Sequence, residues 1–300
     1  MASISTAPHR SAPSQYTRPR PYSVTHLRAL RVQTFQGQKT MKPSHLPSIA
    51  LIPCAGKAAR LGNPSRSKEL LRVSELLPGR PYAPGIETLL DLTLQNCSAA
   101  GIRRAVIPIR SCKQDLADTL GEDKRFDVCL SVVSIQRTDS VLETVEAALP
   151  CISGQHTLLV FPDILFLPAN AITQAMDAYA GSTADIFLGL IPTDRPDKCD
   201  MVSVDPTGRI QDIFIKDPGA GHLRFGWSFA IWSPSFTQFC AAELERKRTQ
   251  EPENAHIGDL IRAAIQQGPA VDSITFPNGI QLDLGTWEDL KRAPAIFSSA

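Results

Sequence analysis

Four cations follow the first apolar run of the chain in one short stretch. Residues 51–71 read LIPCAGKAARLGNPSRSKELL, and the basic residues in this stretch are Lys57, Arg60, Arg66 and Lys68. An arginine offers phosphate oxygens a planar fork, and a lysine offers a mobile point charge. Gly56 permits close backbone approach, and the N–H groups of such a loop can form an anion-binding nest. The stretch is therefore either a phosphate cradle or a solvated basic loop, because it contains neither G-x-x-x-x-G-K-[ST] nor G-x-G-x-x-G.

Two carboxylates lie where strands are expected to end. Asp163 follows the apolar run LLVFP, and Asp283 follows GIQL. Ligands of an open α/β sheet bind beyond the carboxyl ends of its strands, so the two carboxylates could meet over one Mg²⁺. The alternatives are a helix cap or turn for Asp163, and a helix N-cap for Asp283 in competition with Thr286. Lys216, near the end of another apolar run, is either functional or an ordinary edge-strand lysine.

The residues from position 49 onward alternate between strand and helix patterns. We expect strands at 49–53, 104–109, 128–135 and 157–161, and helices at 86–100, 113–120, 141–149 and 168–180. Strands separated by helices predict βαβ units and a mostly parallel sheet. Further strands are expected at 185–191, 200–204, 209–216 and 224–232, followed by helices 235–247 and 257–267, a strand pair at 270–284 and helix 286–295. This second group predicts a mixed-sheet extension.

Composition excludes several classes of protein. At 43% hydrophobic and 20% charged residues, the chain is typical of soluble globular proteins. It has no apolar run near the roughly 18 residues of a membrane span, so we expect no membrane contact. The seven cysteines include no Cys-x-x-Cys pair, which favours reduced thiols in a cytoplasmic protein over a zinc site.

The first 48 residues differ from the rest of the chain. They carry seven of the 31 Lys and Arg and no acid, which leaves 24 basic against 30 acidic residues and a charge of −6 for the remainder. An acidic body argues against a broad nucleic-acid-binding face. We expect residues 1–48 to be a disordered basic segment and residues 49–300 to be a single domain. A transit peptide and an upstream mis-start before Met41 are alternative interpretations of the segment.

The first loop resembles that of the nucleotide-sugar pyrophosphorylases, the sugar-phosphate nucleotidyltransferases. Their signature is Ala-Gly-x-Gly-Thr-Arg-Leu, a spacer, and Pro-Lys-x-Leu, against CAGKAARLG and KELL in this chain. Ala58 and Ala59 replace the second glycine and the hydroxyl residue. Four further motifs follow in order: LLVFPDILF, GRIQDIFIKDP, FGWSFAIW and GIQLDLGTWEDLKRA. The resemblance covers residues 49–295.

The resemblance implies a three-layer, Rossmann-like nucleotidyltransferase fold with a mostly parallel central sheet and a mixed-sheet sugar-binding extension. It also implies the roles of the site residues. The nucleotide contacts would be Ala55, Gly56, Lys57 and Gln136. The catalytic cations would be Arg60, Lys68 and Lys216, the sugar contacts Lys216 and Gly226, and the Mg²⁺ ligands Asp163 and Asp283.

The implied reaction joins a nucleoside triphosphate and a sugar 1-phosphate into a nucleoside-diphosphate sugar and pyrophosphate. UTP or dTTP with glucose 1-phosphate is the expected pair; homo-oligomerisation is left open. The base and sugar motifs depart from the family at Ser140, Leu142, Met201 and Ile215. Two alternatives therefore remain: a cytidylyltransferase acting on a non-sugar phosphate, and a non-catalytic nucleotide-sugar-binding regulator.

Overall fold

The computed structural model describes residues 46–62, 66–121, 124–138, 140–250 and 256–298, without the side chains of 247–250. Every described residue belongs to one compact unit of the chain. The expected basic segment 1–48 lies outside the described residues except for its last three. That segment and the single domain over 49–300 therefore stay predictions.

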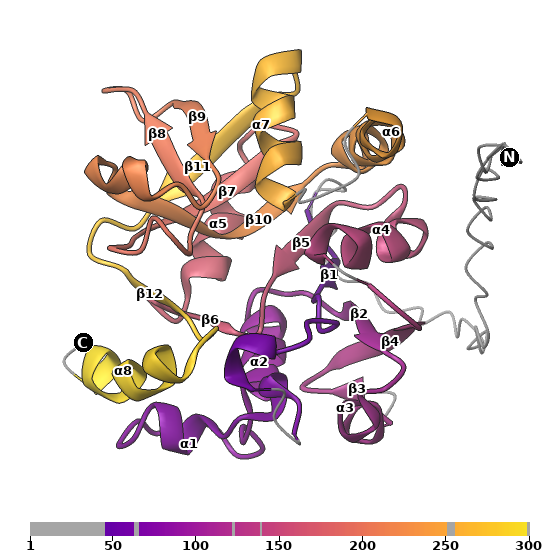
Figure 1. The fold of residues 1–300 in the computed structure, drawn as a ribbon, viewed down its shortest axis with the longest axis vertical. Coiled ribbons are helices and arrows are strands. Elements are labelled where there is room, and N and C mark those ends of the chain that lie inside the picture. The colour runs from indigo at the N-terminus through magenta and orange to yellow at the C-terminus, as the bar shows by residue number, and fades with distance from the viewer. Residues whose placement is uncertain (1–45, 63–65, 122–123, 139, 251–255, 299–300) are drawn as a thin grey trace, which may run out of the picture. The chain divides into compact units, whose positions relative to one another are not determined.

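One large sheet organises the structure (Figure 1). Its strands are, in spatial order, β11 (Val271–Thr275), β7 (Ile186–Pro192), β10 (Phe225–Trp232), β5 (Thr157–Val160), β1 (Ile49–Leu51), β2 (Arg104–Arg110), β4 (Val128–Ile135) and β3 (Lys124–Arg125). The neighbours β5, β1, β2 and β4 are parallel. Strand β10 is antiparallel to both β5 and β7, and it also pairs with the hairpin of β8 (Met201–Val204) and β9 (Ile210–Phe214). The parallel core and the mixed extension are both confirmed.

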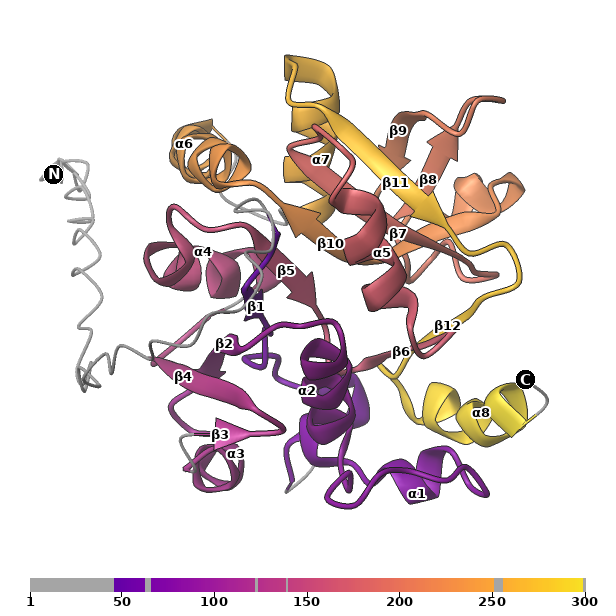
Figure 2. The same cartoon turned by 180° about the vertical axis from the view of Figure 1, so that it is seen from behind.

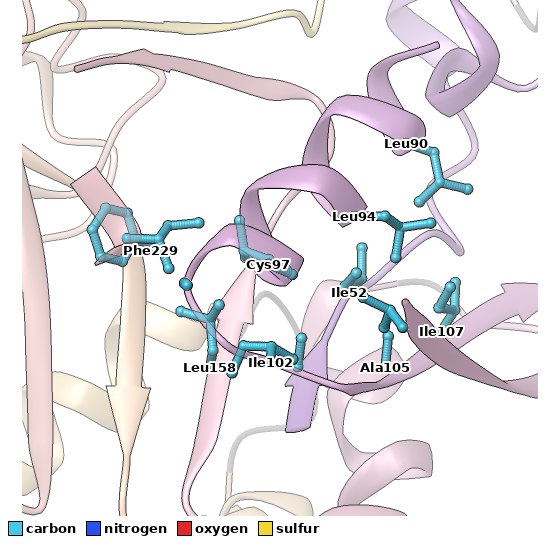
Figure 3. Close-up of a cluster of buried hydrophobic side chains, with 14 of the residues drawn as sticks. Ile52, Leu90, Leu94, Cys97, Ile102, Ala105, Ile107, Leu158 and Phe229 are labelled. Atoms are coloured by element: carbon cyan, nitrogen blue, oxygen red, sulfur yellow. The ribbon is translucent and has the colours of Figure 1, made fainter. Parts of the chain in front are cut away.

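Helices cover both faces of this sheet, as the two views in Figures 1 and 2 show. One face packs against α2 (Leu89–Ala99), α3 (Gln114–Thr119) and α5 (Ala171–Tyr179). The other packs against α4 (Val141–Ile152), α6 (Pro234–Gln250) and α7 (Ile257–Gln267). Successive strand side chains alternate between the faces: Ile52 lies in the first core, where Figure 3 shows it beside Leu94 of α2, and Leu51 lies in the second. The three-layer prediction is confirmed.

A second, two-stranded sheet corrects one prediction. The expected strand pair within 270–284 does not pair with itself: β11 joins the main sheet beside β7, while β12 (Ile280–Asp283) pairs with β6 (Ile164–Leu167). The sequence did not predict β6, because ILFL is only four residues long and lies directly between the expected strand end at Asp163 and the expected helix 168–180. This small sheet packs with α1 (Val73–Leu76) and α8 (Trp287–Ser298) in a separate apolar cluster.

The burial of tryptophans and cysteines differs from residue to residue. Trp232 is buried, whereas Trp287 is 58% exposed because it opens α8 at the protein surface. The cysteines of the described chain are free thiols, as expected, although Cys112 and Cys129 are exposed. Among the described residues, no helix is both long and apolar enough to span a bilayer.

The first loop holds an alanine in a conformation that favours glycine. Ala58 has φ 52° and ψ 30°, in the left-handed region, just before the 3-10 turn Ala59–Leu61. A Cβ in this region costs roughly 1–2 kcal/mol. The position at which the sequence departs from the family's second glycine is therefore one that still requires the glycine conformation.

We predict that Ala58→Gly stabilises the protein. The substitution removes the left-handed strain but adds freedom to the unfolded chain, so the free energy of unfolding should rise by about 0.5–1 kcal/mol. Urea denaturation of wild type and variant measures this difference in the free energy of unfolding. The matched control Ala59→Gly, one residue into the right-handed turn, should destabilise slightly. Equal effects of the two variants would contradict the assigned backbone conformation.

Candidate active site

Strand pairing brings Asp163 and Asp283 together. In the β6–β12 pair, Asp283 lies opposite Ile164, the neighbour of Asp163. The backbone N–H of Leu284 also donates to the carbonyl of Asp163 at 2.9 Å. The two predicted carboxylates, 120 positions apart in the chain, are therefore held on adjoining segments.

Lys68 forms an ion pair with Asp163, and both side chains are mostly buried. Burial disfavours the charged form of Lys68, but Asp163 and Glu69 outweigh it and raise the pKa of Lys68 above its usual range. Burial likewise opposes ionisation of Asp163, and Lys68 outweighs it and lowers the pKa of this carboxyl. At neutral pH the pair is therefore a buried ammonium and carboxylate.

Among the described residues, Asp283 has no ion-pair partner equivalent to the Lys68 of Asp163. Burial and then the charge of Asp163 raise the pKa of Asp283 to about 6, although Lys68 and Arg60 act in the opposite direction. The guanidinium of Arg60 lies against Gly285, where an added Cβ would come within 2.8 Å of a terminal nitrogen. Gly285 thus lets Arg60 approach the carboxylate cluster. The cluster holds more negative charge than Lys68 alone neutralises.

Side chains of the segment after β2 hold the first loop in place through hydrogen bonds and an ion pair. The ammonium of Lys113 donates at 2.8 Å to the carbonyl of Cys54 and to both carboxylate oxygens of the fully buried Glu69. Asp115 accepts hydrogen bonds from the backbone and hydroxyl of Ser67 at 2.6 and 2.8 Å. Both ends of the loop are therefore tied to one neighbouring segment, which limits its movement around Lys68.

Two cavities adjoin at this cluster. The first has a volume of about 290 Å³ and lies over the first loop, between the ends of β1, β2 and α4. The second has a volume of about 200 Å³ and lies toward the mixed extension and α7. Both are lined by the same five residues: Arg60, Lys68, Val141, Phe161 and Asp163. The Lys68–Asp163 ion pair therefore forms part of the wall that the two cavities share.

The predicted site residues divide between these cavities. The first is lined by Ala55, Gly56 and Lys57, and the second by Lys216 and Asp283. Lys216 has a left-handed φ of 46°, a strained conformation for a residue with a side chain and one often found at ligand sites.

Two predicted residues line neither cavity. Gln136 is exposed on the segment after β4. Gly226 is buried, and an added Cβ there would come within 2.9 Å of the amide nitrogen of Gln281, which does line the second cavity. Ser140, which replaces a family glycine, caps α4 by accepting a hydrogen bond from the backbone of Glu143 at 3.1 Å.

Sequence reasoning missed several residues that line the cavities. They are Arg110 in the first cavity, and Lys198, Asp200, His256 and Gln281 in the second. Arg110 ends the strand pattern RAVIPIR and Asp200 precedes the pattern MVSV, so the ends of the expected strands were the available signal. His256 gave no signal, because it is an isolated histidine at a helix start.

A metal ion at this site would have few protein ligands. Within the described chain, no three His, Cys, Asp or Glu side chains come together as a metal-binding group. Asp163 and Asp283 are thus the two carboxylates of the cluster that could hold a divalent cation. Mg²⁺ is commonly bound by one or two carboxylates, with substrate phosphates and water as its other ligands.

Comparisons with known proteins agree with this architecture. A model of the nucleotidyl transferase family matches residues 81–298. A search of the curated proteins found no match to the sequence.

Solved structures show the same fold at low identity. A Bacillus anthracis protein described as a glucose-1-phosphate thymidylyltransferase, in complex with sucrose, is 16% identical with a TM-score of 0.69, covering 84% of this chain and 95% of its own. A UDP-glucose pyrophosphorylase bound to UDP-glucose is 14% identical with a TM-score of 0.68, covering 85% and 99%. The inositol-1-phosphate CTP transferase of T. maritima is 17% identical with a TM-score of 0.64, covering 86% and 97%.

The family match spans most of the chain and includes Asp163, Asp283 and the mixed extension, whereas the first loop lies before residue 81. The resemblance to this family is therefore confirmed. This chain belongs to the nucleotidyl transferase family.

Proposed function

We propose that this nucleotidyl transferase joins a nucleoside triphosphate to a sugar 1-phosphate, releasing pyrophosphate and a nucleoside-diphosphate sugar. The observation that carries the proposal is the wall of five residues common to the two cavities. A reaction between two phosphorylated substrates needs one cavity for each and a cationic meeting point. Lys68 provides that cation, and Arg60 adds a second beside it.

The first cavity suits the nucleotide. It lies at the first strand-to-helix loop of the sheet, the usual ligand position in open α/β folds. Gly56 and Lys57 line it, so the loop brings backbone N–H groups and the positive charge of a lysine to this cavity. The second cavity then takes the acceptor, with Lys216 placed for its phosphate.

The chain's contribution to the reaction is positioning and neutralisation of charge. A phosphate oxygen of the acceptor attacks the α-phosphorus, and pyrophosphate leaves. Arg60 and the loop amides would bind the leaving group, while Lys68 and Lys216 reduce the repulsion between the approaching anions. The attacking oxygen is already ionised, so no residue needs to act as a general base.

The carboxylate pair fits Mg²⁺. Two buried carboxylates lie beside one paired lysine, and burial and the charge of Asp163 raise the pKa of Asp283 to about 6. Asp163 and Asp283 would hold the ion, which when bound would neutralise phosphate charge and orient both substrates. The chain's residues would supply two ligands and leave the remaining positions to phosphate and water.

The acceptor is the least constrained part of the proposal. UTP or dTTP with glucose 1-phosphate remains the pair we expect. The fold likeness to an inositol-1-phosphate CTP transferase supports, as a second candidate, a cytidylyltransferase acting on a non-sugar phosphate. A non-catalytic regulator is the weaker alternative, because a protein that only binds has no need of the buried carboxylate pair.

Asp200 lines the second cavity and brings to it a carboxylate whose hydrogen bonding is incomplete. One carboxylate oxygen accepts a hydrogen bond from the indole of Trp227 at 3.2 Å, and the other is buried without a hydrogen-bond partner among the described residues. Burial raises the pKa of Asp200 to about 6, and Lys216 counteracts only part of this effect. The acceptor cavity thus contains a carboxylate available to a hydrogen-bond donor.

We predict that Lys68→Met lowers kcat by roughly 10²–10³-fold, because it removes the charge at the meeting point of the phosphates. Pyrophosphate release is measured with the best pair found by crossing five nucleoside triphosphates with sugar 1-phosphates and inositol 1-phosphate. The matched control is Arg66→Ala, an exposed cation of the same loop, which should retain activity. A folded Lys68→Met protein with wild-type turnover would refute the role of Lys68.

Metal dependence gives a second prediction. Chelation should abolish pyrophosphate release and added Mg²⁺ should restore it. Asp283→Asn should raise the Mg²⁺ concentration for half-maximal rate by about tenfold or more, because it removes one of two ligand carboxylates. Asp272→Asn, on the exposed side of β11, serves as the control. An unchanged Mg²⁺ requirement in Asp283→Asn would exclude this residue as a ligand.

The raised pKa of Asp200 gives a pH-dependent stability. The folded pKa of about 6 exceeds the unfolded value, so this group's stability contribution is full below pH 4 and is lost as pH rises through 6. Asp200→Asn cannot ionise. Relative to wild type, the variant should therefore gain about 1 kcal/mol of unfolding free energy between pH 5 and pH 7.5.

Urea unfolding at the two pH values measures this gain. The control is Asp197→Asn, since Arg195 lowers the pKa of that exposed carboxyl and the variant should show no such gain. A pH-independent difference between wild type and Asp200→Asn would show that Asp200 has an ordinary pKa.

A further inference from the structure

Arg110 lines the first cavity and is held there by one hydrogen bond. It is the last residue of β2, and its Nε donates to the carbonyl of Ala55 at 2.8 Å. This hydrogen bond uses only the Nε–H group of the guanidinium. The two terminal nitrogens form no hydrogen bond with the described residues, while the side chain lines the cavity together with Gly56 and Thr138. Arg110 is therefore anchored and retains donors for a ligand.

The sheet order separates Arg110 from the reaction centre. Asp163 follows β5, Arg110 ends β2, and β1 with its loop lies between these two strands. Two strand spacings amount to about 10 Å. A triphosphate whose α-phosphorus lies at Lys68 and Asp163 would therefore place its nucleoside, rather than its phosphates, near the ends of β2 and β4.

The surroundings of Arg110 also suit a base more than a phosphate. The neighbouring hydroxyl of Thr138 is already bound to the carbonyl of Ser140 at 2.7 Å, and Val141 adds an apolar surface. The carbonyl of Cys54 is held by Lys113. Arg110 is thus a charged side chain of this cavity that ends β2, and a guanidinium has five donors and no acceptor.

We propose that Arg110 is a specificity-determining residue that reads the nucleobase, favouring bases that present carbonyl oxygens over adenine. This inference rests on the proposed function, which places a nucleoside triphosphate in the first cavity. Uracil, thymine and guanine present a carbonyl acceptor where adenine presents an amino donor. The guanidinium has no acceptor for a hydrogen bond from that amino group. A bidentate contact contributes about 1–3 kcal/mol of discrimination.

The test is equilibrium binding of five nucleoside triphosphates, ATP, GTP, CTP, UTP and dTTP, to the full-length protein by calorimetry with Mg²⁺ and no acceptor. Wild type should bind UTP, dTTP or GTP about 5- to 100-fold more tightly than ATP. Arg110→Gln, which offers an acceptor as well as donors, should reduce that ratio to below about threefold. Arg110→Lys should retain overall affinity and only part of the ratio, because its ammonium also donates without accepting but lacks the planar fork.

The matched control is Arg104→Gln, at the opposite end of β2, where the side chain bonds to Gln155 away from the cavity. Its ratio should equal that of wild type, and thermal melting confirms that each variant folds. Tightest wild-type binding of ATP, or an equal loss of affinity for every triphosphate in Arg110→Gln, would overturn the base-reading role alone. Absence of binding for all five triphosphates would instead overturn the proposed function.

Discussion

The antiparallel pairing of β6 with β12 is the constraint on which the candidate site depends. These strands are short and stand apart from the main sheet, yet their register places Asp283 beside the segment that carries Asp163. Lys68 reaches the same point because Lys113 and Asp115 tie its loop to the end of β2. Three distant parts of the chain therefore converge through backbone pairing and buried polar contacts.

The electrostatics of this convergence explain the suitability of the site for two phosphates and a cation. Lys68 lowers the pKa of Asp163, whereas burial and the charge of Asp163 keep the pKa of Asp283 raised although Lys68 and Arg60 act in the opposite direction. Such a cluster is unfavourable by itself, and the divalent ion that we propose would balance its charge. The strained backbone at Ala58 and Lys216 occurs at the same two cavities, where strain is commonly retained for function.

The sequence predicted the layers and the parallel core, because periodicity and strand–helix alternation are local signals. It also identified Arg60, Lys68, Asp163, Lys216 and Asp283, which the structure places around the two cavities. It missed β6 and the pairing of β6 with β12, since pairing across 120 residues leaves no local pattern. Arg110 and Asp200 were missed for a similar reason: their roles arise from what lies opposite them, and a lone charge at a strand end is usually solvated.

The central claim is that the nucleotide and the acceptor occupy separate cavities and that their phosphates meet at Lys68. A crystal structure of the protein with Mg²⁺ and a nucleoside-diphosphate sugar tests it most directly. The account predicts the nucleoside in the cavity of Gly56 and Arg110, the sugar in the cavity of Asp200 and Trp227, and the α-phosphate against the ammonium of Lys68. A product whose two halves share one cavity, or whose phosphates lie away from Lys68, would contradict it.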